Sequence, residues 1–523
     1  MDANSVLGRY FTNTDRSVFA LINLPETVKG ALFARYSRSA KSLRQLFVDE
    51  FATDLANDPG AMSNAGTARA EKLYDKVFNE YGDDSVAQLG GVHLACENVS
   101  NILTKVLERG RLMAYLEQST RYIPYTDRTG DVWRYHVPAE LDGHPLREKY
   151  VAALDATFET YAKWIDPLRA HFAAKYPKAP GDSEGVYKSA IKAKALDTLR
   201  GLLPAATKSN VGIYGTGQAY EALILRMRAH PLAEVRACAD EMLTELRKVI
   251  PAFLTRVDQP DRGGKWTEYL AGARASTQAA AERFAGDALL EDRPEVTLTD
   301  FDPDGEVKVA AAALYPVAEL PDDQLLAMAR QMTPAERADV LQAYVGHRTN
   351  RRHKPGRAFE RTSYRFDVLT DYGAFRDLQR HRLMTIDWQA LTTRHGHILP
   401  EAIIECGARE EWDAAMERSA ALYEDLYAAG FHDAAQYAVS LAYRIRFIMD
   451  MNAREAMHVI ELRTAPAGHP AYRRVCQQMH TLIRDQAGHQ AIADAMQYAD
   501  HSMVELERLQ EERRLEKKRQ AHR

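Results

Sequence analysis

Alternating apolar and polar positions predict a buried strand in the second half of the chain. In ERTSYRFDVLTD, residues 360–371, the apolar side chains of Tyr364, Phe366 and Val368 fall on one face, because successive side chains of a strand point to opposite faces. Apolar residues at helical spacing follow in DAAMERSAALYEDLYAAG and in RVCQQMHTLIRDQAGHQAIADAMQ, as in helices that pack one face on a core. The pattern predicts a helix-rich α+β domain.

Three phrases occur twice along the chain in the same order. LERGRLM (107–113) shares Arg-x-Arg-Leu-Met with LQRHRLM (378–384), and a Val-Lys pair precedes a tyrosine by eight residues in both 28–36 and 307–315. EALILRMRAHP (221–231) resembles EAMHVIELRTAPAGHP (455–470), and a cysteine follows each. Three ordered matches predict a tandem duplication, with insertions in the first copy.

The duplication sets the expected domains. We expect a first copy at 17–254, a connector at 255–294 with an Ala-rich helix, a second copy at 295–498 and a charged helical tail at 499–523. In each copy a helix begins near the Val-Lys pair and a short helix precedes the Arg-x-Arg phrase. Acidic residues alternate with basic ones in the tail, which favours a solvated helix over a nucleic-acid-binding arm.

Composition narrows the setting. The 523 residues carry a net charge of −5, so the chain as a whole lacks the basic surface of a nucleic-acid or membrane binder. Four cysteines are scattered without CxxC spacing, which predicts neither disulfides nor a zinc site, and we expect no metal. No segment reaches eighteen apolar residues and no signal peptide is apparent, so we expect a cytoplasmic protein.

The Arg-x-Arg phrases suit anions. Arg380, His381 and Arg382 offer the planar, charged donors that bind phosphate or carboxylate. A surface run of basic side chains is the alternative, since short basic triplets are common. In the first copy Arg109, Arg111 and Arg121 surround Glu117, Gln118 and Ser119, a set that suits a phosphorylated sugar. Glu117 and Arg121 are alternatively a helical ion pair, because they stand four residues apart.

A polar face is also expected on a later helix. In NAREAMHVIELR, residues 452–463, Asn452, Glu455 and His458 recur every three residues and share part of one face. A structural or solvent-facing histidine is the alternative there.

Together these phrases carry a family resemblance. RGRLMAYLEQSTRY (109–122) and RHRLMTIDWQ (380–389) resemble the RHRxxSxNExSxRY signature of the flavin-dependent thymidylate synthases. NAREAMHVIELR resembles that family's Asn-x-Arg…Leu-Arg helix, and LRGLLP (199–204) resembles its ARxxLP phrase. Glu360 stands twenty residues before Arg380, as the glutamate of the family's HxSPFEH phrase does before its RHR.

The resemblance implies two fused family domains that have lost different parts. The first copy departs from the family pattern at Gly110, Ala114 and Gly217, where the family has histidine, serine and the helix asparagine. The second copy departs at Trp388, Ala390 and Gln436, where the family has glutamate, serine and the ARxxLP arginine. Because the family is homotetrameric, a fused chain would be a pseudo-dimer, and a homodimer of the chain would mimic the tetramer.

The resemblance also implies an activity. The family methylates and reduces dUMP to dTMP with FAD, methylenetetrahydrofolate and NADPH, and it uses no protein nucleophile, so no catalytic side chain is expected. By carry-over the nucleotide would contact Arg109, Glu117, Gln118, Ser119, Arg121, Arg200 and Arg463. The flavin would contact Glu360, Arg380, His381, Arg382, Asn452, Arg454 and His458. A flavoprotein of the same fold with another nucleotide-like substrate and a non-catalytic scaffold are the alternatives.

Overall fold

The chain folds into two compact units that do not coincide with the repeats. The computed structural model describes residues 3–36, 39–51, 88–119, 123–130, 132–504, 506 and 508–521. Unit 1 comprises 1–99, 106–118 and 209–289, and unit 2 comprises 100–105, 119–208 and 290–523. Residues 119–208 of the first copy therefore pack with the second copy inside unit 2.

Unit 1 is built on a sheet with the strand order β1-β5-β2. Strand β2 pairs antiparallel with β5, and Met113 lies opposite Gly215. Its elements are α1 (Ala3–Tyr10), α2 (Glu26–Tyr36), α3 (Leu43–Glu50), β1 (Gly91–Ser100), β2 (Met113–Glu117), β5 (Lys208–Thr216), α9 (Gly217–Arg228), α10 (Ala233–Leu246), η5 (Pro251–Asp258), η6 (Pro260–Gly264) and α11 (Lys265–Ala285). The helix α6 (Asn101–Leu107) belongs partly to each unit.

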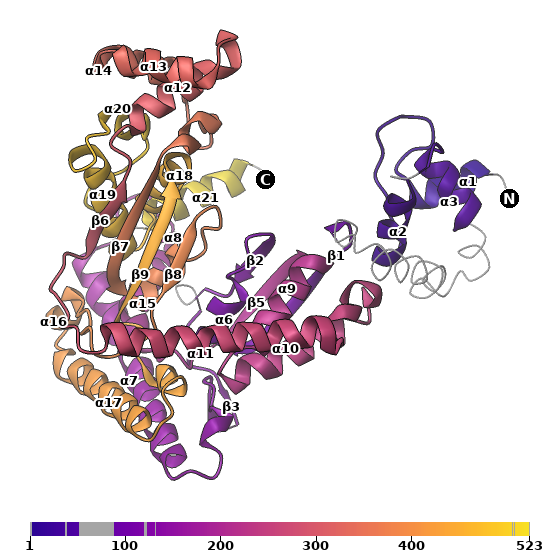
Figure 1. The fold of residues 1–523 in the computed structure, drawn as a ribbon. Helices are drawn as coiled ribbons and strands as arrows, with labels where there is room; N and C mark the ends of the chain where they lie inside the picture. The colour runs from indigo at the N-terminus through magenta and orange to yellow at the C-terminus, as the bar shows by residue number, and fades with distance from the viewer. Residues whose placement is uncertain are drawn as a thin grey trace. The chain divides into compact units, whose positions relative to one another are not determined.

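Unit 2 is built on an antiparallel sheet with the strand order β6-β7-β9-β8. These strands are β6 (Val296–Phe301), β7 (Ser363–Asp371), β8 (Thr385–Trp388) and β9 (Arg444–Asn452). Strands β7 and β9 lie side by side in Figure 1. Tyr364, Phe366 and Val368 are fully buried, which confirms the face predicted from the alternating pattern.

Helices complete unit 2. Those that follow a strand directly are α15 (Tyr372–Leu378) after β7 and α18 (Ala453–Arg463) after β9. The others are α7 (Leu146–Lys175), α8 (Glu184–Leu199), α12 (Gly305–Ala318), α13 (Asp322–Gln331), α14 (Pro334–Val345), α16 (Glu401–Glu405), α17 (Arg409–Ala428), α19 (Pro470–Asp485), α20 (Gln490–Ala495) and α21 (Leu509–Ala521). Short elements are β3 (Arg128–Thr129), β4 (Val132–Trp133), η3 (Ala139–Leu141), η4 (Arg200–Leu202), η7 (Arg357–Arg361) and η8 (Ala434–Ala438).

The order of elements repeats. When the short elements β3, β4, η3 and α16 are set aside, both copies contain a strand, a short helix, a second strand, one or two long helices, a 3-10 helix, a third strand and a helix, from β1 to α9 and from β7 to α18. The sheet order β1-β5-β2 likewise matches β7-β9-β8. The predicted helix-rich α+β class and the repetition of its order are confirmed.

The junctions between the last strand and its helix correct one expected correspondence. Asn452 caps α18, since its side chain accepts a hydrogen bond from the backbone N of Glu455. Thr216 caps α9 in the same way, by accepting from the backbone N of Ala219. The counterpart of Asn452 is therefore Thr216 and not Gly217.

Two further expectations meet the structure at β2 and α11. Residues 113–117 form a strand, so the alternative of a helical ion pair from Glu117 to Arg121 is wrong, and Arg121 itself lies outside the described residues. The connector does contain a helix, α11, none of whose residues is buried. Among the described residues, no helix combines the length and the apolar character needed to cross a bilayer.

Counterpart segments of the two copies meet inside unit 2. The backbone N of Ala205 donates to the carbonyl of Val439 (2.8 Å), and the backbone N of Leu441 donates to the carbonyl of Leu203 (2.9 Å). Pro204 and Ser440 form the bridge between these bonds. Pro204 stands four residues after Arg200, and Ser440 stands four residues after Gln436, the residue at the same ARxxLP position in the second copy. Such reciprocal contacts are the local signature of two-fold symmetry.

Candidate functional site

Two arginines from different copies converge on one carboxylate. Arg200, from the first copy, begins the 3-10 helix η4, and its Nη1 lies 3.6 Å from Oδ2 of Asp377 on α15. Arg463, from the second copy, ends α18, and its Nη1 lies 3.9 Å from Oδ1 of the same aspartate. All three residues belong to unit 2. The structure thus brings together two of the predicted nucleotide-binding residues, although they are 263 positions apart in the sequence.

Arg200 is held in a buried setting with spare donor capacity. Its side chain is 4% exposed, and Oδ1 of Asp197 lies 3.9 Å from its Nη1. Its Nη2 has no hydrogen-bond partner among the described residues. The residue also lines a cavity of ≈ 430 Å³, with Asp371, Trp412 and Arg474 among the other lining residues. A buried guanidinium with an unused N–H is suited to an additional acceptor.

The Arg380–His381–Arg382 phrase does not act as a single surface run. It follows the end of α15, and Arg380 is exposed, His381 is buried and Arg382 is half-buried. Nε of Arg463 donates a hydrogen bond to Nε2 of His381 (2.9 Å). Arg382 makes no hydrogen bond or ion pair with any residue that the structure describes. The buried histidine excludes the alternative of three equivalent surface cations.

The start of α18 holds the other predicted residues. Nη1 of Arg454 pairs with Oε1 of Glu360 (3.1 Å), and its Nε donates to the carbonyl of Pro355 (2.9 Å). Glu360 also accepts from Nε of Arg357 (3.1 Å). The side-chain oxygen of Asn452 caps the helix by accepting a backbone hydrogen bond, so its side-chain NH₂ group is the part that could bind a ligand.

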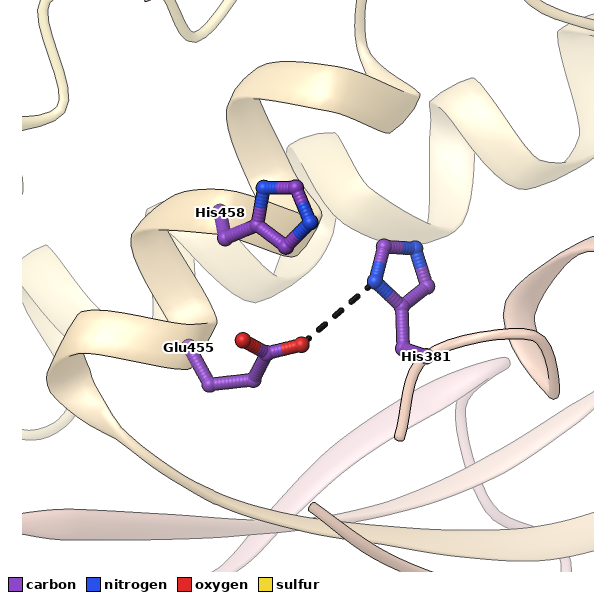
Figure 2. A group of neighbouring side chains, drawn as sticks. All are labelled: His381, Glu455 and His458. Carbon is purple, nitrogen blue, oxygen red and sulfur yellow. Dashed lines mark ion pairs between the residues drawn. The ribbon is translucent and has the colours of Figure 1, made fainter. Parts of the chain in front are cut away.

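Glu455 and His458 point from α18 toward His381 (Figure 2). Nδ1 of His381 lies 3.5 Å from Oε1 of Glu455, and the two imidazole rings are 5.3 Å apart at 71°. The sequence predicted that Glu455 and His458 share a helix face, and the structure confirms it. His458 is half-buried, and its ring packs edge to face on the buried His381, which agrees better with the structural alternative than with a solvent-facing one.

Burial sets the charges of this group. It lowers the pKa of His381 well below its usual value, and the nearby Arg463 guanidinium lowers it further. Burial also lowers the pKa of His458 to about 4, against the opposing pull of Glu455. For Glu455 burial raises the pKa, since the charged form is disfavoured away from water. Both imidazoles are therefore neutral near pH 7.

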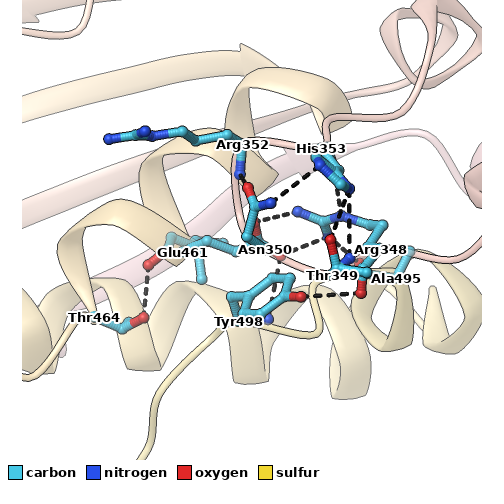
Figure 3. Close-up of polar contacts among 10 residues, drawn as sticks. Arg348, Thr349, Asn350, Arg352, His353, Glu461, Thr464, Ala495 and Tyr498 are labelled. Carbon is cyan, nitrogen blue, oxygen red and sulfur yellow. Dashed lines mark hydrogen bonds and ion pairs between the residues drawn. The ribbon is translucent and has the colours of Figure 1, made fainter.

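The basic loop 346–356, which precedes η7, completes the surroundings of α18. Its Arg348 is bound to Glu461 of α18 through two hydrogen bonds of 2.7 and 2.6 Å (Figure 3). Arg348 also donates to the carbonyl of Ala495 (2.7 Å), and the backbone N of Tyr498 donates to Glu461 (3.2 Å). The side chains of Arg348 and Glu461 are almost fully buried, so this pair anchors the loop to the helix.

Sequence reasoning missed this loop and Asp377. Within the described residues, Arg351 and Lys354 of the loop form no hydrogen bond or ion pair, although Lys354 lies near enough to influence Glu455 and the two histidines. The dense basic run HRTNRRHK (347–354) was the available signal. No sequence signal pointed to Asp377, because a single aspartate in a short helix is not specific to any one role.

The remaining predicted residues fall in different parts of the molecule. Arg109 is exposed in the turn after α6, Glu117 is buried at the end of β2, and Gln118 follows it half-buried, all in unit 1. Ser119 is half-buried and belongs to unit 2. With Arg121 undescribed, the structure does not assemble the first copy's Glu-Gln-Ser-x-Arg phrase with the arginine pair at Asp377.

The cations around α18 fit a dinucleotide cofactor. Arg351, Lys354 and Arg382 carry charges that no described residue pairs, and the amide nitrogen of Asn452 donates to no described residue. A pyrophosphate-bearing group would supply the missing anionic acceptors. Of these four residues, Arg382 and Asn452 were predicted to hold a flavin, and Arg351 and Lys354 were not.

The fold and the site define a duplicated α+β protein with cationic side chains gathered around α18. The chain belongs to the thymidylate synthase complementing protein family, whose model matches residues 31–252 and 297–487. The two matches confirm the resemblance and the tandem arrangement.

Named relatives are of two kinds. A UPF0159 protein of Chlamydia muridarum is 37% identical over 514 residues, which is 97% of both chains. A UPF0159 protein of Thermoplasma acidophilum is 30% identical over 520 residues, 92% of this chain and 97% of the relative. The flavin-dependent thymidylate synthase of Mycobacterium avium is 30% identical over 199 residues, 37% of this chain and 70% of the relative. The chain is thus similar to full-length UPF0159 proteins and, over part of its length, to flavin-dependent enzymes.

Proposed function

We propose that the protein is an FAD-dependent thymidylate synthase-like enzyme that converts dUMP to dTMP with methylenetetrahydrofolate and NADPH. We further propose that each chain has one site, built from both copies. The observation that carries the proposal is the meeting of Arg200 and Arg463 at Asp377, directly beside His381. Neither copy alone supplies both arginines.

The chain's own residues would bind and orient the reactants. Arg200 and Arg463 would hold the anionic nucleotide, together with Arg109, Glu117, Gln118, Ser119 and Arg121 from the first copy. The flavin would be held by Glu360, Arg380, His381, Arg382, Asn452, Arg454 and His458. Bound there, the flavin supplies the hydride, while the protein contributes position and electrostatics.

The counterpart positions support a single site. Gln436 stands in η8 where the first copy has Arg200 in η4, and Gly110 stands where the second copy has His381. With Thr216 matched to Asn452, Met227 corresponds to Arg463, because each is eleven residues beyond its helix cap. Glutamine, glycine and methionine offer no positive charge to a phosphate, so the counterpart site would bind poorly.

The reciprocal bonds around Pro204 and Ser440 support the pseudo-dimer. We propose that the two copies pair as two subunits of the family would, and that two chains associate into a tetramer-like homodimer. The molecular mass of the purified chain by light scattering tests the second part. A monomer at micromolar concentration with full flavin content would contradict it.

The first test is the visible absorption spectrum of the purified full chain, with FAD added and dUMP then titrated. We expect about one FAD per chain, a spectrum that dUMP perturbs, and dTMP formation once methylenetetrahydrofolate and NADPH are supplied. FAD binding without a response to dUMP or dTMP product would favour a flavoprotein with another nucleotide-like substrate. No FAD binding would favour the non-catalytic scaffold.

Matched variants distinguish the proposed site from the corresponding positions in the other copy. Arg382 and Arg111 are the second arginines of the two Arg-x-Arg phrases. We expect Arg382→Ala to weaken FAD binding about tenfold or more, since a charged hydrogen bond contributes ~1.5–3 kcal/mol, and Arg111→Ala to leave it within about twofold. Arg200→Ala should weaken dUMP binding, whereas Gln436→Ala should not. Equal effects within either pair would contradict one hybrid site.

A further inference from the structure

His381, Glu455 and His458 form a compact set of metal-ligating side chains. One ligand atom from each of the three lies within 4.8 Å of the others, and Figure 2 shows the three side chains directed into a common space. Glu455 and His458 are one helical turn apart on α18, and His381 comes from the loop after α15. Two different elements thus converge on the space between the three side chains.

The spacing is close to that around a bound ion. Zinc lies about 2.0–2.2 Å from imidazole nitrogen and carboxylate oxygen, so two donors on a tetrahedral ion are roughly 3.3–3.6 Å apart. Nδ1 of His381 and Oε1 of Glu455 are already separated by 3.5 Å. The largest separation is at most 4.8 Å, so the donors would have to approach one another by roughly 1 Å to reach the tetrahedral spacing.

The donor chemistry also suits a cation. A neutral imidazole binds a metal ion through one ring nitrogen, and both rings are directed into the common space. The Glu455 carboxyl is buried, so a nearby cation would offset the cost of its negative charge. Two imidazoles and one carboxylate are typical ligands of zinc, iron and related divalent ions.

Arg463 controls access to this site. Its Nε donates to Nε2 of His381, so the proton of the neutral ring is on Nδ1, facing Glu455. A metal at Nδ1 requires the proton to move to Nε2, where it would meet the Arg463 N–H group as a second donor. Arg463 must therefore turn away from the ring, and Asp377 lies 3.9 Å from its Nη1. Lys354 adds a further positive charge near the site.

We infer that His381, Glu455 and His458 form a binding site for one divalent transition-metal ion, and that Arg463 opposes its binding. The sequence predicted no metal, because that expectation rested on the spacing of the cysteines, and His381 stands 74 positions before Glu455. The site shares His381 and His458 with the proposed function, so the cation and the flavin are alternative ligands of these two side chains. The remaining coordination positions of the ion would be taken by water.

The test is a titration of the untagged full chain with Co²⁺ after chelator treatment and dialysis, followed by visible absorption. We expect a saturable d–d band at about one Co²⁺ per chain that Zn²⁺ abolishes. Glu455→Gln and His458→Ala should each weaken Co²⁺ binding at least about tenfold. The control is His480→Ala, because Nδ1 of His480 lies 2.9 Å from Nε2 of His501, a histidine pair away from the site. We expect this variant to bind Co²⁺ as the wild type does.

A gain of affinity guards against misfolded variants. Arg463→Gln removes the opposing charge, and its side-chain carbonyl can accept the Nε2 proton of His381, as outer hydrogen-bond partners of metal-bound histidines do. We expect Co²⁺ to bind this variant about tenfold more tightly. Affinity that is unchanged in Arg463→Gln, or a band that survives Glu455→Gln and disappears in His480→Ala, would overturn the proposal.

The two proposals fail separately. FAD binding and dTMP formation are measured with chelator present, so they do not depend on the metal. An active flavoprotein without a Co²⁺ band overturns only the metal site. A one-to-one Co²⁺ band that depends on Glu455, in a chain that binds no FAD, overturns only the proposed function.

Discussion

Replacing Glu461 by Gln tests whether the buried ion pair with Arg348 holds the basic loop 346–356 on α18. Gln has the shape of Glu but can accept only one of the two guanidinium hydrogen bonds, and its NH₂ group faces the second guanidinium N–H. Arg348 keeps its charge, and the side chains of the pair are only 1% and 3% exposed. The substitution therefore leaves a buried charge without its counter-charge.

The expected cost follows from that burial. Removing one partner of a buried pair destabilises proteins by about 3–5 kcal/mol, because the remaining charge is desolvated and uncompensated. The carbonyls of Ala495 and His353 still accept from Arg348, which favours the lower part of this range. A double variant, Arg348→Met with Glu461→Leu, removes both charges and should recover most of the loss.

Amide hydrogen exchange in residues 453–463 and 346–356 measures the local free energy of opening. We expect faster exchange in both segments for Glu461→Gln and near wild-type exchange for the double variant. The matched control is Glu424→Gln, whose partner Arg394 is half exposed, as is Glu424 itself, and an exposed pair contributes about 0–1 kcal/mol. If the two single variants lost equal stability, the anchoring role of the buried pair would be refuted.

Three further predictions concern the same unit. Asp377→Asn should tighten dUMP binding about tenfold, as measured by calorimetry. The Asp377 carboxylate lies 3.6 and 3.9 Å from the two arginines and attracts them by up to ~4 kcal/mol at an effective dielectric of 20. Unchanged affinity would show that the carboxylate does not compete with the ligand. His458 has a folded pKa of about 4 against 6.5 when unfolded, so the unfolded chain binds the proton first and stability falls as pH drops from about 6.5 to 4. This loss of stability is at most about 3 kcal/mol, and less with solvent screening. It should be absent in His458→Asn when the urea midpoints of the variant and the wild type are compared between pH 6.5 and 4. The raised pKa of Glu455 changes stability in the opposite direction in both the wild type and the variant. Gly305→Ala should cost about 1–3 kcal/mol in urea unfolding, because its Cβ would stand 2.4 Å from Cε1 of His489 and 2.7 Å from Oγ1 of Thr362; a neutral substitution would mean that these side chains yield freely.

Local patterns in the sequence predicted the elements that local physics determines. The alternation in 360–371 identified the buried face of β7, and the spacing in 452–463 identified α18 with Glu455 and His458 on one face. The repeated phrases identified the duplication, because each falls on the same kind of element in both copies: the Arg-x-Arg phrases follow the short helices α6 and α15, and the EAL and EAM phrases lie in α9 and α18. Fold class and repeat order were thus accessible before any coordinates.

The parts that the sequence did not reveal depend on contacts between distant residues. Glu461 and Arg348 are 113 positions apart, and nothing in either neighbourhood indicates the partner. Sequence reasoning matched Asn452 to Gly217, whereas the capping hydrogen bonds match it to Thr216, one residue earlier. Hydrogen-bond geometry is a stricter guide to correspondence than short similar phrases.

The distribution of losses between the copies follows from the reciprocal contact at Pro204 and Ser440. Because that contact places the first copy's Arg200 beside the second copy's Asp377, a two-fold relation assigns the second copy's Gln436 to the counterpart site. Under the proposed function this difference has a physical reason. Arg200 is retained where Arg463 and His381 are also close to Asp377, whereas its counterpart Gln436 offers no positive charge to a phosphate.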